Sequence, residues 1–326
     1  MDRVTQRRAP GGMCVIAIGM LLALAAGSRA LAGAPADALG TQPWLRSAVV
    51  RGERQVPHSR APGSLYAPIG VLANESLDER LWTQGTAFLV SRCHALTAAH
   101  NVVGTPRFRM LAGYPQDPAA LAGARLTFLI GQGLGASFGH VVRARVVALG
   151  QFDPRDPNSR TEDYGLLELS ECVGRHYGHI RLWSTSLEAL VAAPGAIISG
   201  GYPADRDYRE GVWIEEGCSI AGRAPGAGAG FWGHDCTTSP GMSGGPLMIK
   251  GRDGRLYAVA VHKDGVSGTQ HSYIPALWNG AVSVAALLPR IQRFVCPCAG
   301  PGAVEYSLAV PALDDPFGAP AGRMER

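Results

Sequence analysis

The ten residues from Thr238 to Leu247, TSPGMSGGPL, place Ser243 inside a glycine-rich turn. Gly241 and Gly244 flank this serine closely, so the backbone there can adopt dihedral angles that residues with a Cβ avoid. Such a turn can expose the serine hydroxyl and aim neighbouring N–H groups at one point. A serine nucleophile needs both, because its oxygen must be accessible and because donors must meet the negative charge that develops opposite it. The stretch therefore indicates a candidate nucleophile.

Two upstream stretches offer the other parts of a catalytic serine site. A serine hydroxyl is a weak nucleophile at neutral pH, and it needs a base that is itself oriented by a third group. His100 ends the stretch LTAAH, which follows the apolar residues 87–90, and Asp163 begins the stretch DYGLLEL. The order His100, Asp163, Ser243 is one of three known for a Ser-His-Asp triad. Its gaps of 63 and 80 residues are each long enough to hold most of a small β-barrel.

The motifs TAAH at 97–100, DYGLL at 163–167 and GMSGGP at 241–246 resemble the three signature blocks of trypsin-like (chymotrypsin-fold) serine endopeptidases. The resemblance covers roughly residues 65–292. It implies an all-β fold of two packed antiparallel six-stranded β-barrels, with the triad in the cleft between them and a helix at the C-terminal end. It also implies an oxyanion hole formed by the backbone N–H groups of Gly241 and Ser243.

Two competing interpretations of these residues stay open. The motif Gly-x-Ser-x-Gly also fits the nucleophile elbow of α/β-hydrolase esterases, but that fold needs a helix after the serine and an Asp and a His further downstream. Pro246 stands where that helix would begin, and the 83 residues after Ser243 show no alternation of strands with long amphipathic helices. The second alternative is a catalytically inactive trypsin-like module that binds a partner or a peptide.

The resemblance also locates a specificity pocket for the side chain that precedes the scissile bond. Its positions fall on Thr237, Thr238 and the strand from Val259 to Lys263, and no Asp stands at the base of the pocket to favour Lys or Arg. Thr238 and His262 are similar to the corresponding pair in bacterial glutamyl endopeptidases. A hydroxyl and an imidazole can both donate to a carboxylate, so a preference for Glu or Asp is expected. Lys263 departs from that pattern, and the alternative is that His262 is a packed strand histidine.

The first 32 residues predict a secretory signal peptide, with an uncleaved membrane anchor as the alternative. A basic start precedes an uncharged apolar stretch at 13–26, and the small residues at 30–32 form a cleavage site. This segment carries +3 of the formal net charge of +4, so the secreted or periplasmic chain is left with +1. Such a charge does not indicate binding to nucleic acid or to an anionic membrane. The expected partner is a peptide or protein substrate of a monomeric enzyme.

Six of the seven cysteines follow the predicted signal peptide, an even number in an oxidising compartment. They allow 15 disulfide connectivities, which the sequence alone does not separate. The favoured pairs are Cys218 with Cys236, which bracket the glycine-rich residues 224–230, and Cys93 with Cys172, which lie near His100 and Asp163. Cys296 and Cys298 form the remaining pair. No Cys-x-x-Cys or His-x-x-x-His spacing indicates zinc, so no metal and no cofactor are expected.

The chain divides into five expected segments. After the signal peptide at 1–32 come a pro-segment or linker at 33–64, an N-terminal barrel at 65–180 with His100 and Asp163, a C-terminal barrel at 181–295 with Ser243, and a tail at 296–326. The segment 33–64 suggests a zymogen whose possible processing points are Arg51, Arg54 and Arg60; an ordered arm is the alternative. A helix is expected at 285–294. The clearest strands are expected at 85–90, 125–130, 140–149, 165–169, 196–200, 208–215, 246–250 and 257–262.

Overall fold

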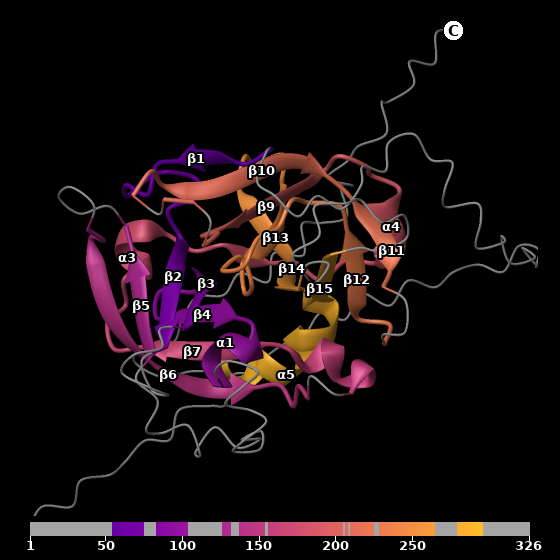
Figure 1. The fold of residues 1–326 in the computed structure, drawn as a ribbon, viewed down its shortest axis with the longest axis horizontal. Helices are drawn as coiled ribbons and strands as arrows, with labels where there is room; N and C mark the ends of the chain where they lie inside the picture. Colours follow the sequence, from indigo (N-terminus) through magenta and orange to yellow (C-terminus); the bar gives the residue numbers. More distant parts are fainter. Residues whose placement is uncertain are drawn as a thin grey trace, which may run out of the picture.

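The computed structural model describes most of the chain between residues 54 and 295. The described ranges are 54–74, 83–103, 126–131, 137–153, 156–204, 206–207, 209–224, 228–264 and 279–295. The predicted signal peptide, the tail at 296–326 with Cys296 and Cys298, and Arg51 lie outside the described residues. The architecture of the described part is dominated by β-strands, which form two sheets that pack side by side (Figure 1).

The N-terminal half folds into a closed antiparallel barrel. Its strands follow the order β2-β3-β4-β7-β6-β5. The barrel can close because side chains along a strand point alternately into and out of it. In the strand at 126–130, Leu126, Phe128 and Ile130 are buried, while the residues between them are partly exposed. The six strands are β2 (Ile69–Asn74), β3 (Thr83–Leu89), β4 (His94–Thr97), β5 (Leu126–Ile130), β6 (His140–Leu149) and β7 (Gly165–Leu169).

The C-terminal half forms a nine-stranded sheet in the order β1-β10-β9-β13-β14-β15-β12-β11, with β8 paired in parallel to β14. Only Ser219 separates β10 from β11 along the chain. The strand order that begins at β10 and ends at β11 therefore closes on itself. The strands are β1 (Val56–His58), β8 (Arg181–Leu182), β9 (Ile197–Gly201), β10 (Val212–Cys218), β11 (Ile220–Arg223), β12 (Phe231–His234), β13 (Pro246–Lys250), β14 (Leu256–Asp264) and β15 (Asn279–Ser283).

The expected fold class is confirmed, with one correction to the strand count. Counting β10 and β11 as one bent strand, and leaving out β1 and β8, gives the six strands expected of a second barrel. The second sheet has two further short strands. The chain before the first barrel supplies β1, which pairs with β10, and the linker between the barrels supplies β8, which pairs with β14. β1 falls within the segment 33–64, so residues 54–64 form the ordered arm that was the alternative to a linker.

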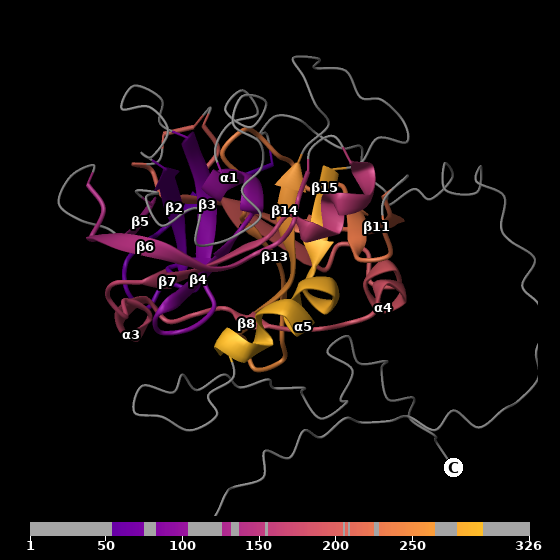
Figure 2. The same ribbon diagram turned by 90° about the horizontal axis from the view of Figure 1, so that it is seen from below.

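Short helices connect the strands, and one longer helix closes the fold. They are α1 (Ala99–Val103), the 3-10 helix η3 (Pro157–Glu162), α3 (Gly174–Tyr177), α4 (Leu187–Val191) and α5 (Val284–Val295). The expected helix at 285–294 is confirmed as α5. It buries Val284, Leu287, Ile291 and Val295 and contacts β14, β15 and β6 (Figure 2). Within the described ranges, no helix has the length and apolarity needed to cross a bilayer.

The largest hydrophobic cluster joins the two halves. It combines side chains of the first barrel, such as Ile69 and Phe88, with side chains of the second sheet, such as Tyr202, Ile214 and Met248. Burial of apolar surface contributes about 25 cal/mol per Å², so this shared core fixes the two sheets against each other. The loops at their junction are therefore held in a defined geometry.

Candidate active site

His100 and Asp163 are brought together by two different elements of the first barrel. The loop after β4 leads into α1, which carries His100, and Asp163 ends η3 immediately before β7. His100 Nδ1 lies 2.8 Å from Asp163 Oδ2, and the His100 backbone N–H donates to Asp163 Oδ1 at 3.0 Å. The carboxylate is fully buried. Two hydrogen bonds to one buried carboxylate fix both the position and the orientation of the imidazole.

A lysine is a third partner of the same carboxylate. Lys263, on β14, places its Nζ 3.7 Å from Asp163 Oδ2 and 4.6 Å from the centre of the Phe152 ring, which also lies edge-on to the His100 ring. Burial acts to raise the pKa of Asp163, but His100 and Lys263 outweigh it and the pKa is lowered from its ordinary value. Asp163 therefore carries its negative charge at neutral pH.

Ser243 lies on the turn before β13 and contacts both the first barrel and β14. Its hydroxyl donates to the Lys263 carbonyl at 2.8 Å. Its own carbonyl accepts from the Thr86 N–H at 2.9 Å and from Asn101 Nδ2 at 2.7 Å. Asn101 follows His100 directly in α1, so one short helix contacts Asp163 through one residue and the serine turn through the next. The His100–Asp163 pair and the turn that carries Ser243 thus lie on elements that Asn101 connects at the junction of the two sheets.

The serine turn requires glycine at two positions. Gly241 and Gly244 have φ angles of +93° and +87°, a region that side chains with a Cβ rarely adopt. A Cβ at Gly244 would also clash with the Thr86 carbonyl and the Thr97 hydroxyl. In this turn the N–H groups of Met242, Gly244 and Gly245 are hydrogen-bonded. No group among the described residues accepts from the N–H of Gly241 or Ser243.

The predicted pocket residues Thr238 and His262 are in direct contact. Thr238 Oγ1 lies 2.7 Å from His262 Nε2, and His262 Nδ1 lies 3.0 Å from Nε2 of a second histidine, His234. Burial, together with the neighbouring His262, lowers the pKa of His234 well below its ordinary value, so this imidazole is neutral. Thr237 is buried as well, but its N–H donates to the carboxylate of Glu215 at 2.6 Å. The Thr237 backbone is therefore held by Glu215, next to the contact between Thr238 and His262.

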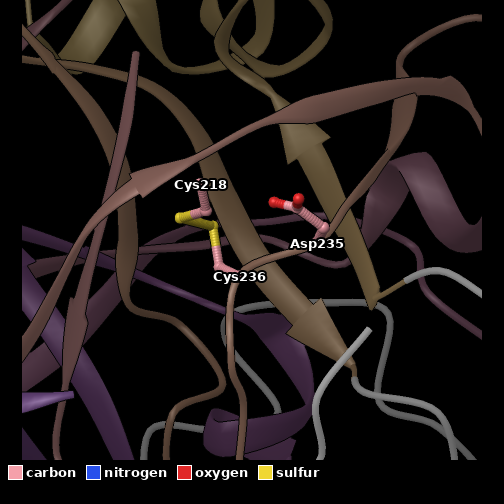
Figure 3. A group of neighbouring side chains, drawn as sticks. All are labelled: Cys218, Asp235 and Cys236. Atoms are coloured by element: carbon pink, nitrogen blue, oxygen red, sulfur yellow. A yellow bond between two sulfur atoms is a disulfide. The ribbon is translucent and has the colours of Figure 1, made fainter. Parts of the chain in front are cut away.

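Both predicted disulfides within the described residues are present. Cys93 pairs with Cys172, and Cys218 pairs with Cys236. Cys218, Cys236 and Asp235 lie close enough together to suggest metal ligands (Figure 3). The two sulfurs are bonded to each other, however, and Asp235 Oδ1 accepts from the Ser219 N–H at 2.6 Å. These residues therefore do not fit a metal, which needs free thiolates.

The sequence does not predict four of the contacts in the site. His234 contacts His262, Lys263 contacts Asp163, Asn101 binds the serine turn, and Glu215 binds the Thr237 N–H. The sequence places Lys263 on the pocket strand, as a departure from the glutamyl-endopeptidase pattern, but does not indicate its contact with Asp163. A signal for Asn101 was available in its position next to His100.

Solved structures of an endopeptidase and of a collagenase share this architecture. A Glu endopeptidase in complex with MPD matches with a TM-score of 0.52 at 15% sequence identity, covering 76% of this chain and 98% of its own. HL collagenase matches with a TM-score of 0.53 at 16% identity, covering 72% and 96%. The chain therefore has the trypsin-like (chymotrypsin-fold) serine protease fold. No protein-family model and no curated protein matches its sequence.

Proposed function

We propose that this protein is a secreted serine endopeptidase that hydrolyses peptide bonds through an acyl-enzyme. The observation that carries this proposal is the buried Asp163 carboxylate, which holds His100 by two hydrogen bonds beside the turn that presents Ser243. A buried carboxylate paired to a histidine costs stability unless it is well compensated. Such a pair beside a glycine turn with a central serine is typical of a nucleophile and its base.

In the proposed reaction, Ser243 attacks the peptide carbonyl carbon and His100 Nε2 accepts the hydroxyl proton. His100 then gives this proton to the leaving amine, and a water molecule hydrolyses the acyl-enzyme by the same steps. The serine hydroxyl must first turn away from the Lys263 carbonyl, to which it donates in the resting site. Asp163 keeps the proton of the neutral imidazole on Nδ1 and stabilises the imidazolium that forms.

The N–H groups of Gly241 and Ser243 form the proposed oxyanion hole. Both belong to the turn that presents the serine, and neither donates to another described residue. Donors that are already oriented gain most when charge develops, because they need no reorganisation during the reaction. The positive φ angle of Gly241 gives this turn its shape.

A fluorophosphonate probe tests the proposal, because it reacts covalently with an activated serine. We expect the exported, processed protein to be labelled, and peptide mapping by mass spectrometry to locate the adduct on Ser243. Labelling should disappear in Ser243→Ala and persist in Ser186→Ala, which removes a hydroxyl that caps α4 outside the site. A folded, processed protein that takes up no probe would favour the inactive binding module.

We further propose that the pocket prefers Glu or Asp before the scissile bond. A proton on His262 Nε2 would be donated to Thr238 Oγ1, which frees the threonine O–H to donate to a substrate carboxylate. This direction requires the His234 tautomer with its proton on Nε2, which would then donate to His262 Nδ1, 3.0 Å away. One of the structural neighbours is named a Glu endopeptidase, which is consistent with this preference.

The preference is tested by profiling cleavage of a peptide library. We expect products that end mainly in Glu or Asp. Thr238→Val should lower kcat/KM for Glu relative to Leu by on the order of 10- to 100-fold, since a hydrogen bond to a charged group contributes about 1.5–3 kcal/mol. The exposed histidine variant His176→Leu is the control and should leave the ratio unchanged. Products that end in Lys, Arg, Leu or Phe would exclude this preference.

A further inference from the structure

Glu215 is a buried carboxylate that lies outside the catalytic triad. It stands on β10 with 1% of its surface exposed. Its Oε2 accepts from the Thr237 N–H at 2.6 Å, and its Oε1 lies 3.0 Å from Arg54 Nη1. In the described part of the chain, Arg54 is its one ion-pair partner. A buried charge without compensation is strongly destabilising, so Arg54 is what permits Glu215 to hold Thr237.

Arg54 and its neighbour Gln55 also bind the backbone of the same loop directly. Arg54 Nη2 donates to the Asp235 carbonyl at 2.7 Å, and Gln55 Nε2 donates to the Thr237 carbonyl at 3.2 Å. Gln55 is 4% exposed and lies 3.8 Å from the sulfur of Met242. Gln55 thus binds the Thr237 carbonyl directly, and Arg54 acts on the Thr237 N–H through Glu215. Gln55 also contacts Met242, the residue before Ser243.

Strand pairing explains how a distant segment arrives at this place. In the antiparallel pair β1–β10, Val56 lies opposite Ile214. Continuing this register by one residue brings Gln55 level with Glu215. β1 lies against β10 (Figure 1), and the arm therefore delivers Arg54 and Gln55 to the loop 235–242, which contains Thr238 and leads into the serine turn.

We propose that Arg54 and Gln55 are positioning residues for the substrate-binding loop 235–242. They act on Thr238 and the pocket through Glu215 and Thr237, and they do not touch the substrate. This inference rests on the proposed peptidase function, because it assigns the arm a role in substrate selection by that site. It makes residues 54–58 part of the active enzyme rather than of a removable pro-segment.

The same contacts restrict where maturation can occur. Arg54 and Arg60 are two of the expected processing points. Cleavage after Arg54 would separate Arg54 from β1, and cleavage after Arg60 would cut the whole arm, with β1, from the barrel. Arg60 is itself 1% exposed and lies over the Phe138 ring, so its peptide bond is poorly accessible in the folded chain. The N-terminus of the active enzyme therefore lies before Arg54.

The test compares Arg54→Met, Glu215→Gln and the double variant in the full-length, exported protein. Arg54→Met leaves Glu215 uncompensated, so we expect kcat/KM for peptides to fall on the order of 100-fold, mainly through KM and with reduced selectivity between Glu and Leu. Glu215→Gln keeps an acceptor for the Thr237 N–H without the charge. The double variant should therefore recover most of the loss. Arg209→Met, which breaks an exposed ion pair with Asp207, is the matched control.

Three outcomes would overturn the inference: wild-type kinetics in Arg54→Met, equal losses in the single and double variants, or labelled protein whose N-terminus is Gln55 or Ala61. Gln55→Ala keeps the charges intact and should also raise KM, which covers the case in which Arg54→Met does not fold. Fluorophosphonate labelling of Ser243 should persist in every folded variant. Loss of labelling in the wild type would instead refute the proposed function.

Discussion

Replacing Ser243 with alanine should lower kcat for peptide hydrolysis by on the order of 10⁴–10⁶ while leaving KM and the melting temperature close to those of the wild type. The large effect follows because every chemical step of the proposed reaction passes through the serine oxygen. His100→Ala should cost a similar factor, since the residues of a triad act as a unit.

The contacts of Ser243 explain why this variant should fold. Thr86 and Asn101 bind its backbone carbonyl, which alanine retains, and the turn is shaped by Gly241 and Gly244. The lost side-chain interaction is the hydrogen bond to the Lys263 carbonyl. Measurements of kcat and KM on a peptide substrate, together with thermal melts, test this expectation. A residual rate above about 1% of the wild type would mean that another group is the nucleophile.

The parts of the candidate site whose geometry follows from the sequence are those set by short local motifs. The glycines around Ser243 are required by the backbone of the turn itself, and their positive φ angles confirm it. His100 and Asp163 each stand next to a strand, β4 and β7, whose pairing brings the two residues into contact. Cys93 and Cys172 flank the same two strands, and their disulfide links them, whereas Cys218 and Cys236 lie at the end of β10 and shortly after β12.

The parts that sequence did not predict depend on the register between distant strands. Arg54 contacts Glu215 because β1 pairs with β10. β1 has only three residues and lies in a segment rich in Ala, Pro and Arg, so no hydrophobic period in the sequence indicates this strand. His234 meets His262 across strands β12, β15 and β14. Lys263 was read as a departure from a pattern, and only the fold shows that its ammonium group reaches Asp163.

Replacing Asp163 with asparagine should lower kcat on the order of 10⁴-fold. One oxygen of the Asp163 carboxylate accepts a hydrogen bond from the His100 backbone N–H, and the other lies within hydrogen-bond distance of His100 Nδ1. Asparagine has one acceptor oxygen, and its NH₂ group facing Nδ1 would favour the imidazole tautomer with the proton on Nε2. That tautomer cannot accept the proton of Ser243. Asp207→Asn, at an aspartate paired with Arg209 outside the site, is the control.

The same variant should also change how stability depends on pH, and the sign follows from the lowered pKa of Asp163. Burial alone would raise this pKa, but His100 and Lys263 lower it. Asp163 therefore stabilises the fold above the carboxyl pKa of the unfolded chain, about 3.9, and this contribution is lost as the pH falls through the lower, folded value. Asp163→Asn lacks it at every pH and leaves the buried Lys263 without its carboxylate.

Thermal melts at a series of pH values between 7 and 3 should show Asp163→Asn well below the wild type at pH 7, with the difference shrinking below about pH 4. Adding Lys263→Met to Asp163→Asn should recover part of the stability at pH 7, because the buried ammonium group that has lost the Asp163 carboxylate is removed, but none of the activity. A difference in melting temperature that stayed constant down to pH 3 would mean that the pKa of Asp163 is the same in the folded and the unfolded chain, so that the fold does not stabilise its charge. In that case Asp163 could not stabilise the imidazolium of His100, and the proposed division of roles within the triad would fail.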